Sequence, residues 1–231
     1  MNPLPAILFS DNWNVYQKII ANNYMLHKEF SHCTREALST AAFPIKSVLD
    51  LGCGDAQLIA KDLVSIGIDS YTGYDLSEAA LEQAAHFLQY LPAQKNLCLG
   101  RMEQLLKSAN ENWDLIYSSY AIHHLSDEGK HEIMQDVYNH LHPNGLFLMI
   151  DVMRKKDQSR DAYMDDYIGG IRQNWPGLEV REQDMIANHI HEYDFPAIDT
   201  DLIDWATSIG FSVQKAPVQD HRHQMLIMQK G

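Results

Sequence analysis

The sequence has few cysteines, no long apolar run and fewer basic than acidic residues. Its three cysteines are odd in number and far apart, and no CxxC pair occurs. This excludes a disulfide framework and favours reduced thiols in the cytoplasm. No segment reaches the roughly 20 apolar residues of a membrane helix, so we expect no membrane partner. Eighteen basic residues stand against 31 acidic ones, for a net charge of −13. That balance repels phosphate backbones and disfavours a nucleic-acid substrate.

The composition is otherwise that of a chain with a buried core. Apolar residues make up 45% of the 231 residues and charged residues 21%, which is ordinary for a globular protein. Without a composition shift or a repeat, we expect one domain over residues 1–231. Its expected parts are a helical cap (1–42), a ligand-binding core (43–151), a helical cover (152–198), and a terminal helix with a β-hairpin (199–231).

The order of apolar patterns predicts the fold class. Before residue 43, apolar residues recur at helical spacing, and from Ser47 short apolar runs alternate with amphipathic stretches. The runs predict strands near 48–51, 70–74, 96–99, 113–117 and 146–151, with helices near 57–64, 78–88, 103–107 and 130–141. Such alternation gives right-handed crossovers and a mostly parallel α/β sheet with helices on both faces.

The rest of the chain breaks this alternation. Two helical patterns follow residue 152, and Gly169-Gly170 within the first marks either a lid hinge or a helix end before Trp175-Pro176-Gly177. After a further helix, runs at 211–215 and 225–229 are joined by a short polar turn. So short a link predicts an antiparallel hairpin.

A glycine loop after the first strand predicts a nucleoside site. Residues 50–54 read Asp-Leu-Gly-Cys-Gly between a buried strand and a helix. Glycines let a ligand approach the backbone closely, and the helix start presents free N–H groups. A dinucleotide site needs a third glycine where Gln57 stands, and Asp55 would repel a diphosphate. A ligand without phosphates fits better.

Asp75 supports the same interpretation. It ends the second strand, where a carboxylate can accept hydrogen bonds from both hydroxyls of a ribose. The alternative is that Asp75 only caps the turn at Ser77. The glycine loop at the right distance favours ribose binding.

Several motifs in order resemble those of the class I S-adenosylmethionine-dependent methyltransferases. Asp50-Leu51-Gly52-Cys53-Gly54 is similar to the first motif of this family, and Tyr74-Asp75-Leu76-Ser77 to its second. The segment 113–125, which contains Ser118 and Ser119, resembles the fourth-strand motif. Residues 141–146 and 206–211 resemble the turn into strand five and the step before the terminal hairpin. The resemblance covers about residues 47–230.

The resemblance implies a fold, a ligand and a reaction. The fold is a Rossmann-like seven-stranded sheet of order 3-2-1-4-5-7-6 whose last strand is antiparallel. The cofactor is S-adenosylmethionine, with Gly52 and Gly54 beside its methionine part and Asp75 at its ribose. The reaction is in-line transfer of a methyl group to a small-molecule acceptor. The residues that the resemblance places around the cofactor are Tyr16, Asp50, Gly52, Cys53, Gly54, Asp75, Leu76, Arg101, Met102, Glu103, Ser118 and Ser119.

Two of these placements depart from the family pattern or have an alternative. Where the family often has an acid that holds the adenine, this chain has Arg101, followed by Met102 and Glu103. We expect the backbone and side chain of Met102 to take over the adenine contact. Tyr16 is placed by the N-terminal helix that often caps the cofactor in this family, with its ring near the sulfonium. Packing on the sheet is the alternative for Tyr16.

Methyl transfer from a sulfonium needs alignment more than it needs a catalytic group. A general base is required only when the nucleophile starts protonated. The candidates are His124, which follows strand four with His123, and His189, on the apolar face of a predicted cover helix. Purely structural roles are the alternative for all three histidines.

We expect no metal. Three H-x-H pairs occur, at 140/142, 189/191 and 221/223, but a spacing of two directs helical side chains apart. The sequence therefore predicts a cytoplasmic S-adenosylmethionine-dependent methyltransferase. The rivals are a regulatory module that binds the same nucleoside without transferring anything, and a nicotinamide-dependent oxidoreductase. The acceptor, the attacked atom and the oligomeric state do not follow from the residues.

Overall fold

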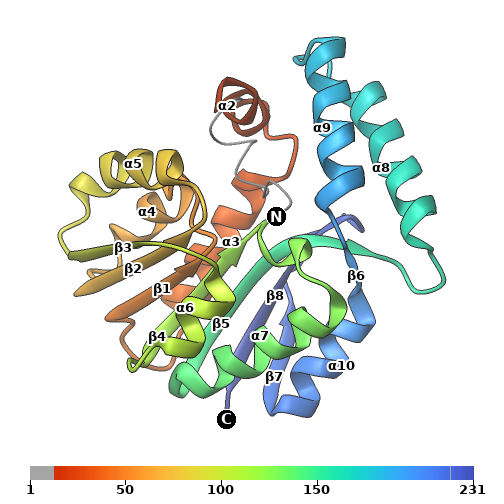
Figure 1. The fold of residues 1–231 in the computed structure, drawn as a ribbon. Coiled ribbons are helices and arrows are strands. Elements are labelled where there is room, and N and C mark those ends of the chain that lie inside the picture. Colours follow the sequence, from red (N-terminus) through yellow and green to blue (C-terminus); the bar gives the residue numbers. More distant parts are fainter. Residues whose placement is uncertain (1–12, 219) are drawn as a thin grey trace.

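A mostly parallel sheet forms the centre of the computed structural model, which describes residues 13–218 and 220–231 (Figure 1). Its main strands run in the order β3-β2-β1-β4-β5-β8-β7. They are β1 (Ser47–Leu51), β2 (Ser70–Asp75), β3 (Gln94–Leu99), β4 (Trp113–Ser119), β5 (Leu141–Arg154), β7 (Phe211–Lys215) and β8 (His223–Lys230). Strands β1 to β5 pair in parallel, whereas β8 is antiparallel to both β5 and β7.

The sheet confirms the expected topology, with one addition. A two-residue strand, β6 (Ala197–Ile198), pairs with the end of β5. When β6 is left out of the numbering, the order is the expected 3-2-1-4-5-7-6 with an antiparallel last strand. β6 was not predicted because two residues carry no periodic signal.

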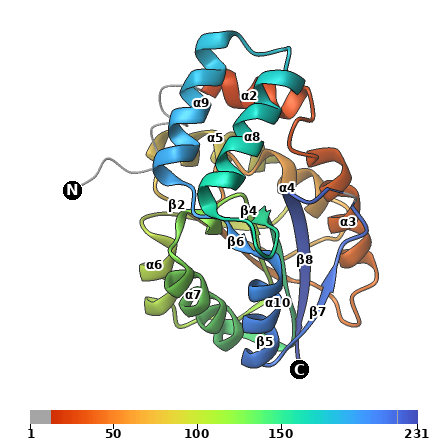
Figure 2. The same ribbon diagram turned by 90° about the vertical axis from the view of Figure 1, so that its right-hand side faces the viewer.

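Helices cover both faces of the sheet (Figure 2). One face carries α3 (His27–Ser39), α4 (Gln57–Leu63), α5 (Glu78–Phe87) and the short η1 (Leu88–Tyr90); the other carries α6 (Met102–Ser108), α7 (Asp127–His140) and α10 (Asp199–Ile209). Side chains of β5 alternate between the two cores, since Leu148 and Ile150 pack with the first group of helices and Phe147 and Met149 with the second. This two-faced burial explains why the strands read as nearly continuous apolar runs.

A third group of helices stands at the carboxyl edge of the sheet. It comprises α2 (Trp13–Ala21), α8 (Arg160–Asn174) and α9 (Val180–Tyr193), which lie above the strand ends in both views (Figures 1 and 2). These helices share a core with Val152 at the end of β5. The ring of Trp175 stacks on Tyr24, 4.9 Å away. The carboxyl ends of the parallel strands are therefore roofed, which is where α/β sheets bind ligands.

One local expectation was wrong in detail. The N-terminal helical pattern is broken into α2 and α3, because Asn23 and Leu26 adopt left-handed backbone angles between them. The part of that expectation on residues 1–12 lies outside the described residues. Gly169-Gly170 lies inside α8, which ends at Asn174, directly before Trp175-Pro176-Gly177, as the second of the two alternatives for this segment expects. Among the helices of residues 13–218 and 220–231, none is long and apolar enough to cross a membrane.

A buried histidine at the start of α3 makes stability depend on pH. His27 is 4% exposed, and both of its ring nitrogens lack a hydrogen-bond partner among the described residues. Burial lowers the pKa of His27 to about 4, the nearby His223 adds to this, and Glu29 opposes it. The unfolded chain therefore binds this proton at a higher pH than the folded one.

We expect the free energy of unfolding to decrease as pH falls from about 6.5 to about 4, because protonation then favours the unfolded state. The contribution of His27 is about 3 kcal/mol for a shift of this size. Urea unfolding of wild type and His27→Leu across this range checks it, with the exposed His32→Leu on the same helix as the control. If wild type and His27→Leu lose stability in parallel, the assignment is wrong.

Candidate active site

The loop between β1 and α4 is shaped by its glycines and by Asp75. Gly52 and Gly54 both have positive φ angles, +68° and +52°. A Cβ on Gly52 would lie 2.4 Å from the Cβ of Ala121, so this glycine lets the loop pack against the segment after β4. The Asp75 carboxylate accepts the N–H of Gly54 at 2.9 Å and that of Ser77 at 2.8 Å. Asp75 thus makes the predicted turn contact and also fixes the glycine loop.

Two adjoining cavities lie at this edge of the sheet, of about 420 and 90 Å³. Tyr16, Gly52 and Tyr120 line both. The predicted cofactor residues on the larger cavity are Tyr16, Gly52, Asp75, Leu76, Arg101, Met102 and Glu103. Those on the smaller one are Tyr16, Asp50, Gly52, Cys53, Gly54 and Ser119. The structure therefore brings all but one of them to these two cavities, which share part of their lining.

Ser118 is the exception. It is fully buried in β4, and its hydroxyl donates to the carbonyl oxygen of Leu51 at 3.0 Å. It lines neither cavity. The side chain joins β4 to β1, so the expected cofactor contact is corrected to a structural one. Strand alternation decides the matter, because the neighbouring Ser119 faces the smaller cavity.

Three carboxyl groups make the glycine-loop end of these cavities acidic. Burial raises the pKa of Asp50 to about 7 and that of Asp55 to about 6, and burial also raises the pKa of Asp75. Asp50 accepts a hydrogen bond from the Tyr71 hydroxyl at 2.7 Å. Arg101 also lines the larger cavity, but its guanidinium is paired with Glu103 at 2.6 Å. The electrostatics favour a cation over a diphosphate.

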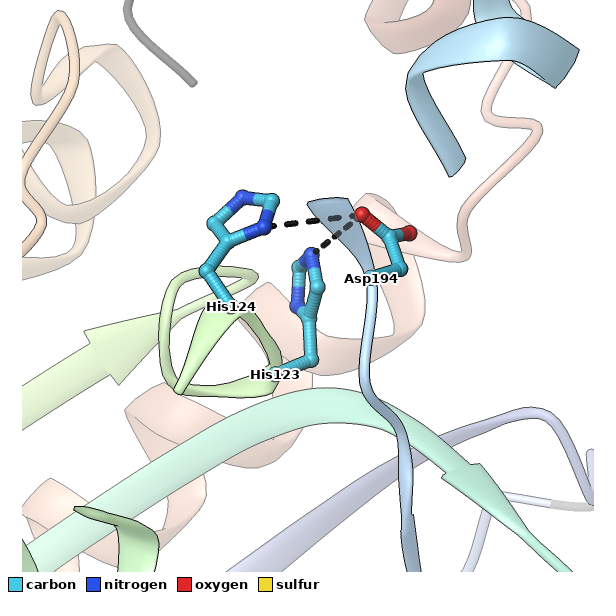
Figure 3. A group of neighbouring side chains, drawn as sticks. All are labelled: His123, His124 and Asp194. Atoms are coloured by element: carbon cyan, nitrogen blue, oxygen red, sulfur yellow. Dashed lines mark ion pairs between the residues drawn. The ribbon is translucent and has the colours of Figure 1, made fainter. Parts of the chain in front are cut away.

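In the larger cavity, several histidines converge on one aspartate. His123 and His124 belong to the single turn η2 (Ile122–His124) after β4, and Asp194 directly follows α9 (Figure 3). Oδ1 of Asp194 lies 3.4 Å from Nε2 of His123 and 3.5 Å from Nδ1 of His124. Nε2 of His189, from α9, is 3.9 Å away. All four residues line the larger cavity.

The protonation states within this cluster differ. Burial would lower the pKa of His123, but the charges of Asp151 and Asp194 raise it to about 10. Burial and the neighbouring His123 lower the pKa of His124 to about 4, and burial lowers that of His189. His124 and His189 are consequently neutral at pH 7, the state in which an imidazole can accept a proton.

Asp151 holds His123 in place. One oxygen of its buried carboxylate accepts the backbone N–H of His123 at 2.9 Å. The other lies 2.5 Å from Nδ1 of the same residue. Asp151 stands near the end of β5, beside β4, so the sheet itself positions this contact. The orientation of the imidazole is fixed, with Nε2 directed at Asp194.

The remaining wall of the larger cavity is apolar and aromatic. It comes from the roofing helices and their neighbours, namely Ile19, Met25, Val152, Tyr167, Trp175, Ile186 and Ile190. The cavity therefore has an acidic end at the glycine loop, a histidine cluster, and an apolar surface beneath α8 and α9.

Sequence reasoning found His124 and His189 but missed two carboxylates: Asp194, which contacts both histidines, and Asp151, which holds His123. Asp151 could have been found, because it ends the apolar run of β5. That strand pairs with β4, and His123 follows the end of β4. Asp194 carried none, because Tyr193-Asp194-Phe195-Pro196 has no recognisable pattern. The H-x-H pairs were the wrong place to look for clustered histidines, since the cluster uses adjacent residues on one tight turn.

The central part of this chain is similar in sequence to known methyltransferases. Residues 48–145 match the family described as "Methyltransferase domain". Ribosomal protein L11 methyltransferase of Staphylococcus aureus strain JH1 is 27% identical over 144 residues. The match covers 60% of this chain and 42% of the relative, so the chain spans well under two thirds of that protein.

Solved structures of similar fold extend over nearly the whole chain. The plantazolicin methyltransferase BpumL, in complex with a monoazolic desmethylPZN analogue and SAH, is 13% identical with a TM-score of 0.67, over 98% of this chain and 94% of its own. Magnesium protoporphyrin IX methyltransferase from Synechocystis PCC 6803, with bound SAH, is also 13% identical, with a TM-score of 0.66 and 97% of each chain covered. At such identities the likeness concerns the fold.

The family match covers the glycine loop, Asp75 and the turn after β4, and the topology of the sheet is that of the structural neighbours. Residues 48–145 are therefore similar to a methyltransferase domain, and the fold of the chain is like that of the structural neighbours.

Proposed function

We propose that this protein transfers a methyl group from S-adenosylmethionine to a small-molecule acceptor that enters the cavity beneath α8 and α9. The observation that carries the proposal is the larger cavity, whose lining includes Gly52 and Asp75 together with an apolar wall and a histidine cluster, and which shares Gly52 with the smaller cavity at the glycine loop. We also infer that residues 1–231 act as one domain in the cytoplasm. The free thiols of Cys33, Cys53 and Cys98 fit a reducing compartment.

The residues at the glycine loop suit the cofactor. S-adenosylmethionine carries positive charge at its sulfonium and ammonium groups and has no phosphate. Asp55 and Asp75 supply negative charge beside the glycine loop, whereas Asp50, whose pKa burial raises to about 7, is only partly ionised at neutral pH. Asp75 has both oxygens bound to backbone N–H groups, and each retains a lone pair for a ribose hydroxyl. Tyr16 lines both cavities and would contact the sulfonium end of the cofactor.

The cofactor, when bound, supplies a methyl group that forms a bond to the acceptor nucleophile as its bond to sulfur breaks, and the electron pair stays on sulfur. The protein has to align the acceptor with that methyl group and keep water out. Positioning of this kind can supply roughly 7–11 kcal/mol of barrier lowering. The rigid walls Trp175, Tyr167 and Val152 are buried and suited to this task.

The walls also indicate the class of acceptor. An apolar body would lie against the aromatic side chains, and its nucleophilic atom would face the histidines. The cavity, at about 420 Å³, is the size of a small-molecule site. We assign the proton-accepting role to His189, whose Nε2 lies 3.9 Å from the Asp194 carboxylate that would stabilise the charged imidazole. His124 is the other candidate for this role.

Incubation of the protein with S-adenosylmethionine and a panel of aromatic hydroxyl, thiol and amine compounds tests the proposal. We expect one acceptor to gain the mass of one CH₂ group while an equal amount of S-adenosylhomocysteine appears. Binding of S-adenosylhomocysteine without product from any acceptor would favour the regulatory module instead. His191→Gln, an exposed change outside the cavity, serves as an active control.

A further inference from the structure

The histidine cluster contains a buried carboxylate oxygen that has ion-pair contacts but no hydrogen bond to another described residue. Asp194 is 5% exposed, and its Oδ1 has no hydrogen-bond partner among the residues that the structure describes. A buried carboxylate oxygen without a partner is costly. Two imidazole nitrogens nevertheless point at this oxygen from the single turn η2, as the dashed lines in Figure 3 show.

The distances suit a shared cation better than direct hydrogen bonds. A charge-assisted N–H···O bond measures about 2.7–2.9 Å, whereas Oδ1 of Asp194 is 3.4 Å from His123 and 3.5 Å from His124. Two ligands bound tetrahedrally to zinc at 2.0–2.1 Å lie about 3.3 Å apart. One ligand atom from each of the three residues lies within 4.8 Å of the other two.

The surroundings supply the support that metal-binding histidines need. Such a histidine usually donates its other ring N–H to a carboxylate, which fixes the tautomer and the ring. Nδ1 of His123 has this contact with Asp151 at 2.5 Å. Nδ1 of His124 lies 3.1 Å from the carbonyl oxygen of Tyr193, a contact that metal binding would replace as the ring proton moves to Nε2.

We infer that His123, His124 and Asp194 bind a divalent transition-metal ion, with zinc as the representative, on the wall of the acceptor cavity. Two imidazoles and one carboxylate favour such an ion over magnesium or calcium, which prefer oxygen ligands alone. Three protein ligands leave a coordination position for a molecule in the cavity. The expectation of no metal considered only the H-x-H pairs and overlooked this set.

The role of the ion in catalysis rests on the proposed function, whereas the site itself rests only on the three ligands. The open position suits an acceptor that offers a hydroxyl or a thiol. Coordination would favour loss of the acceptor proton, which passes to His189 and from there to solvent. The deprotonated oxygen or sulfur then carries the electron pair that forms the new bond to carbon. The acceptor class is therefore a hydroxyl or thiol on an apolar body.

The test is a zinc titration of chelator-treated full-length protein, followed by calorimetry and by measurement of the metal retained after dialysis. We expect one zinc ion per chain. Asp151→Asn leaves all three ligands in place, weakens the support of His123 and also alters the hydrogen bond from the backbone N–H of Val152; it should raise the zinc dissociation constant by roughly 10–100-fold. His124→Ala and Asp194→Asn remove a direct ligand and should raise it further. Cobalt in place of zinc should give the strong visible absorption of a four-coordinate site.

His32→Ala, on an exposed residue far from the cluster in sequence, is the control and should bind zinc as wild type does. Melting curves without metal show which variants fold. The inference fails if wild type retains no zinc, or if folded His124→Ala and Asp194→Asn retain it unchanged. S-adenosylhomocysteine binding is measured on the same samples. If S-adenosylhomocysteine binds normally but zinc does not bind, only the metal site is refuted. If zinc binds but S-adenosylhomocysteine does not, only the proposed function is refuted.

Discussion

Replacing His189 by glutamine is expected to lower kcat for methyl transfer by roughly 10²–10⁴-fold, the usual contribution of a general base. His189 lines the acceptor cavity and lies 3.9 Å from Asp194, so its loss removes the group that takes the acceptor proton. The dissociation constant of S-adenosylhomocysteine should stay the same, because the glycine loop and Asp75 are untouched. Single-turnover rates with saturating cofactor, together with calorimetry, separate the two effects.

His191→Gln is the matched control, since it lies on the same helix two residues away and is exposed. It should retain wild-type kcat. His124→Gln tells whether the neighbouring histidine accepts the proton instead. A His189→Gln enzyme whose kcat stays within a factor of about three of wild type would show that no such base is needed.

Replacing Asp75 by alanine is expected to raise the dissociation constant of S-adenosylhomocysteine by roughly 100-fold. The carboxylate lines the larger cavity and would accept hydrogen bonds from the ribose, each worth about 1.5–3 kcal/mol because one partner is charged. The variant also loses the contact from Gly54 that fixes the loop. Calorimetric titration gives the affinity, and melting curves show that the fold is intact.

Asp69→Ala provides the control for Asp75. Asp69 directly precedes β2, and its side chain is 74% exposed, so its loss should leave affinity unchanged. Equal affinities of wild type and a folded Asp75→Ala variant would refute the ribose role. Asp75 would then serve only the turn at Ser77 and the loop at Gly54.

The sheet could be predicted from the sequence because its pattern is local. Each strand is a short apolar run bounded by turns or helices, and the side chains of Leu148 and Phe147 alternate between two cores as a doubly covered sheet requires. The glycine loop and Asp75 are equally local, since both follow strands whose carboxyl ends meet at one edge. Ser118 was misplaced because the choice between neighbouring serines depends on strand alternation.

The histidine cluster could be predicted only in part, because its geometry is set by packing between distant segments. His123 and His124 lie on η2 at the sheet edge, whereas Asp194 is brought to them by the way α9 packs on α2 and α8. A backbone hydrogen bond from Phe195 to the carbonyl of His123 joins the two segments at 2.9 Å. Contacts between residues some 70 positions apart leave no periodic trace in the sequence.

Calorimetric titration of the purified chain with S-adenosylhomocysteine and, separately, with NAD tests the central claim most directly. An uncharged nucleoside with an amino-acid tail should bind at one site per chain, and NAD should give no heat of binding, because Asp55 and Asp75 oppose a diphosphate at the glycine loop. Tight binding of NAD with no response to S-adenosylhomocysteine would contradict the account and indicate a nicotinamide enzyme.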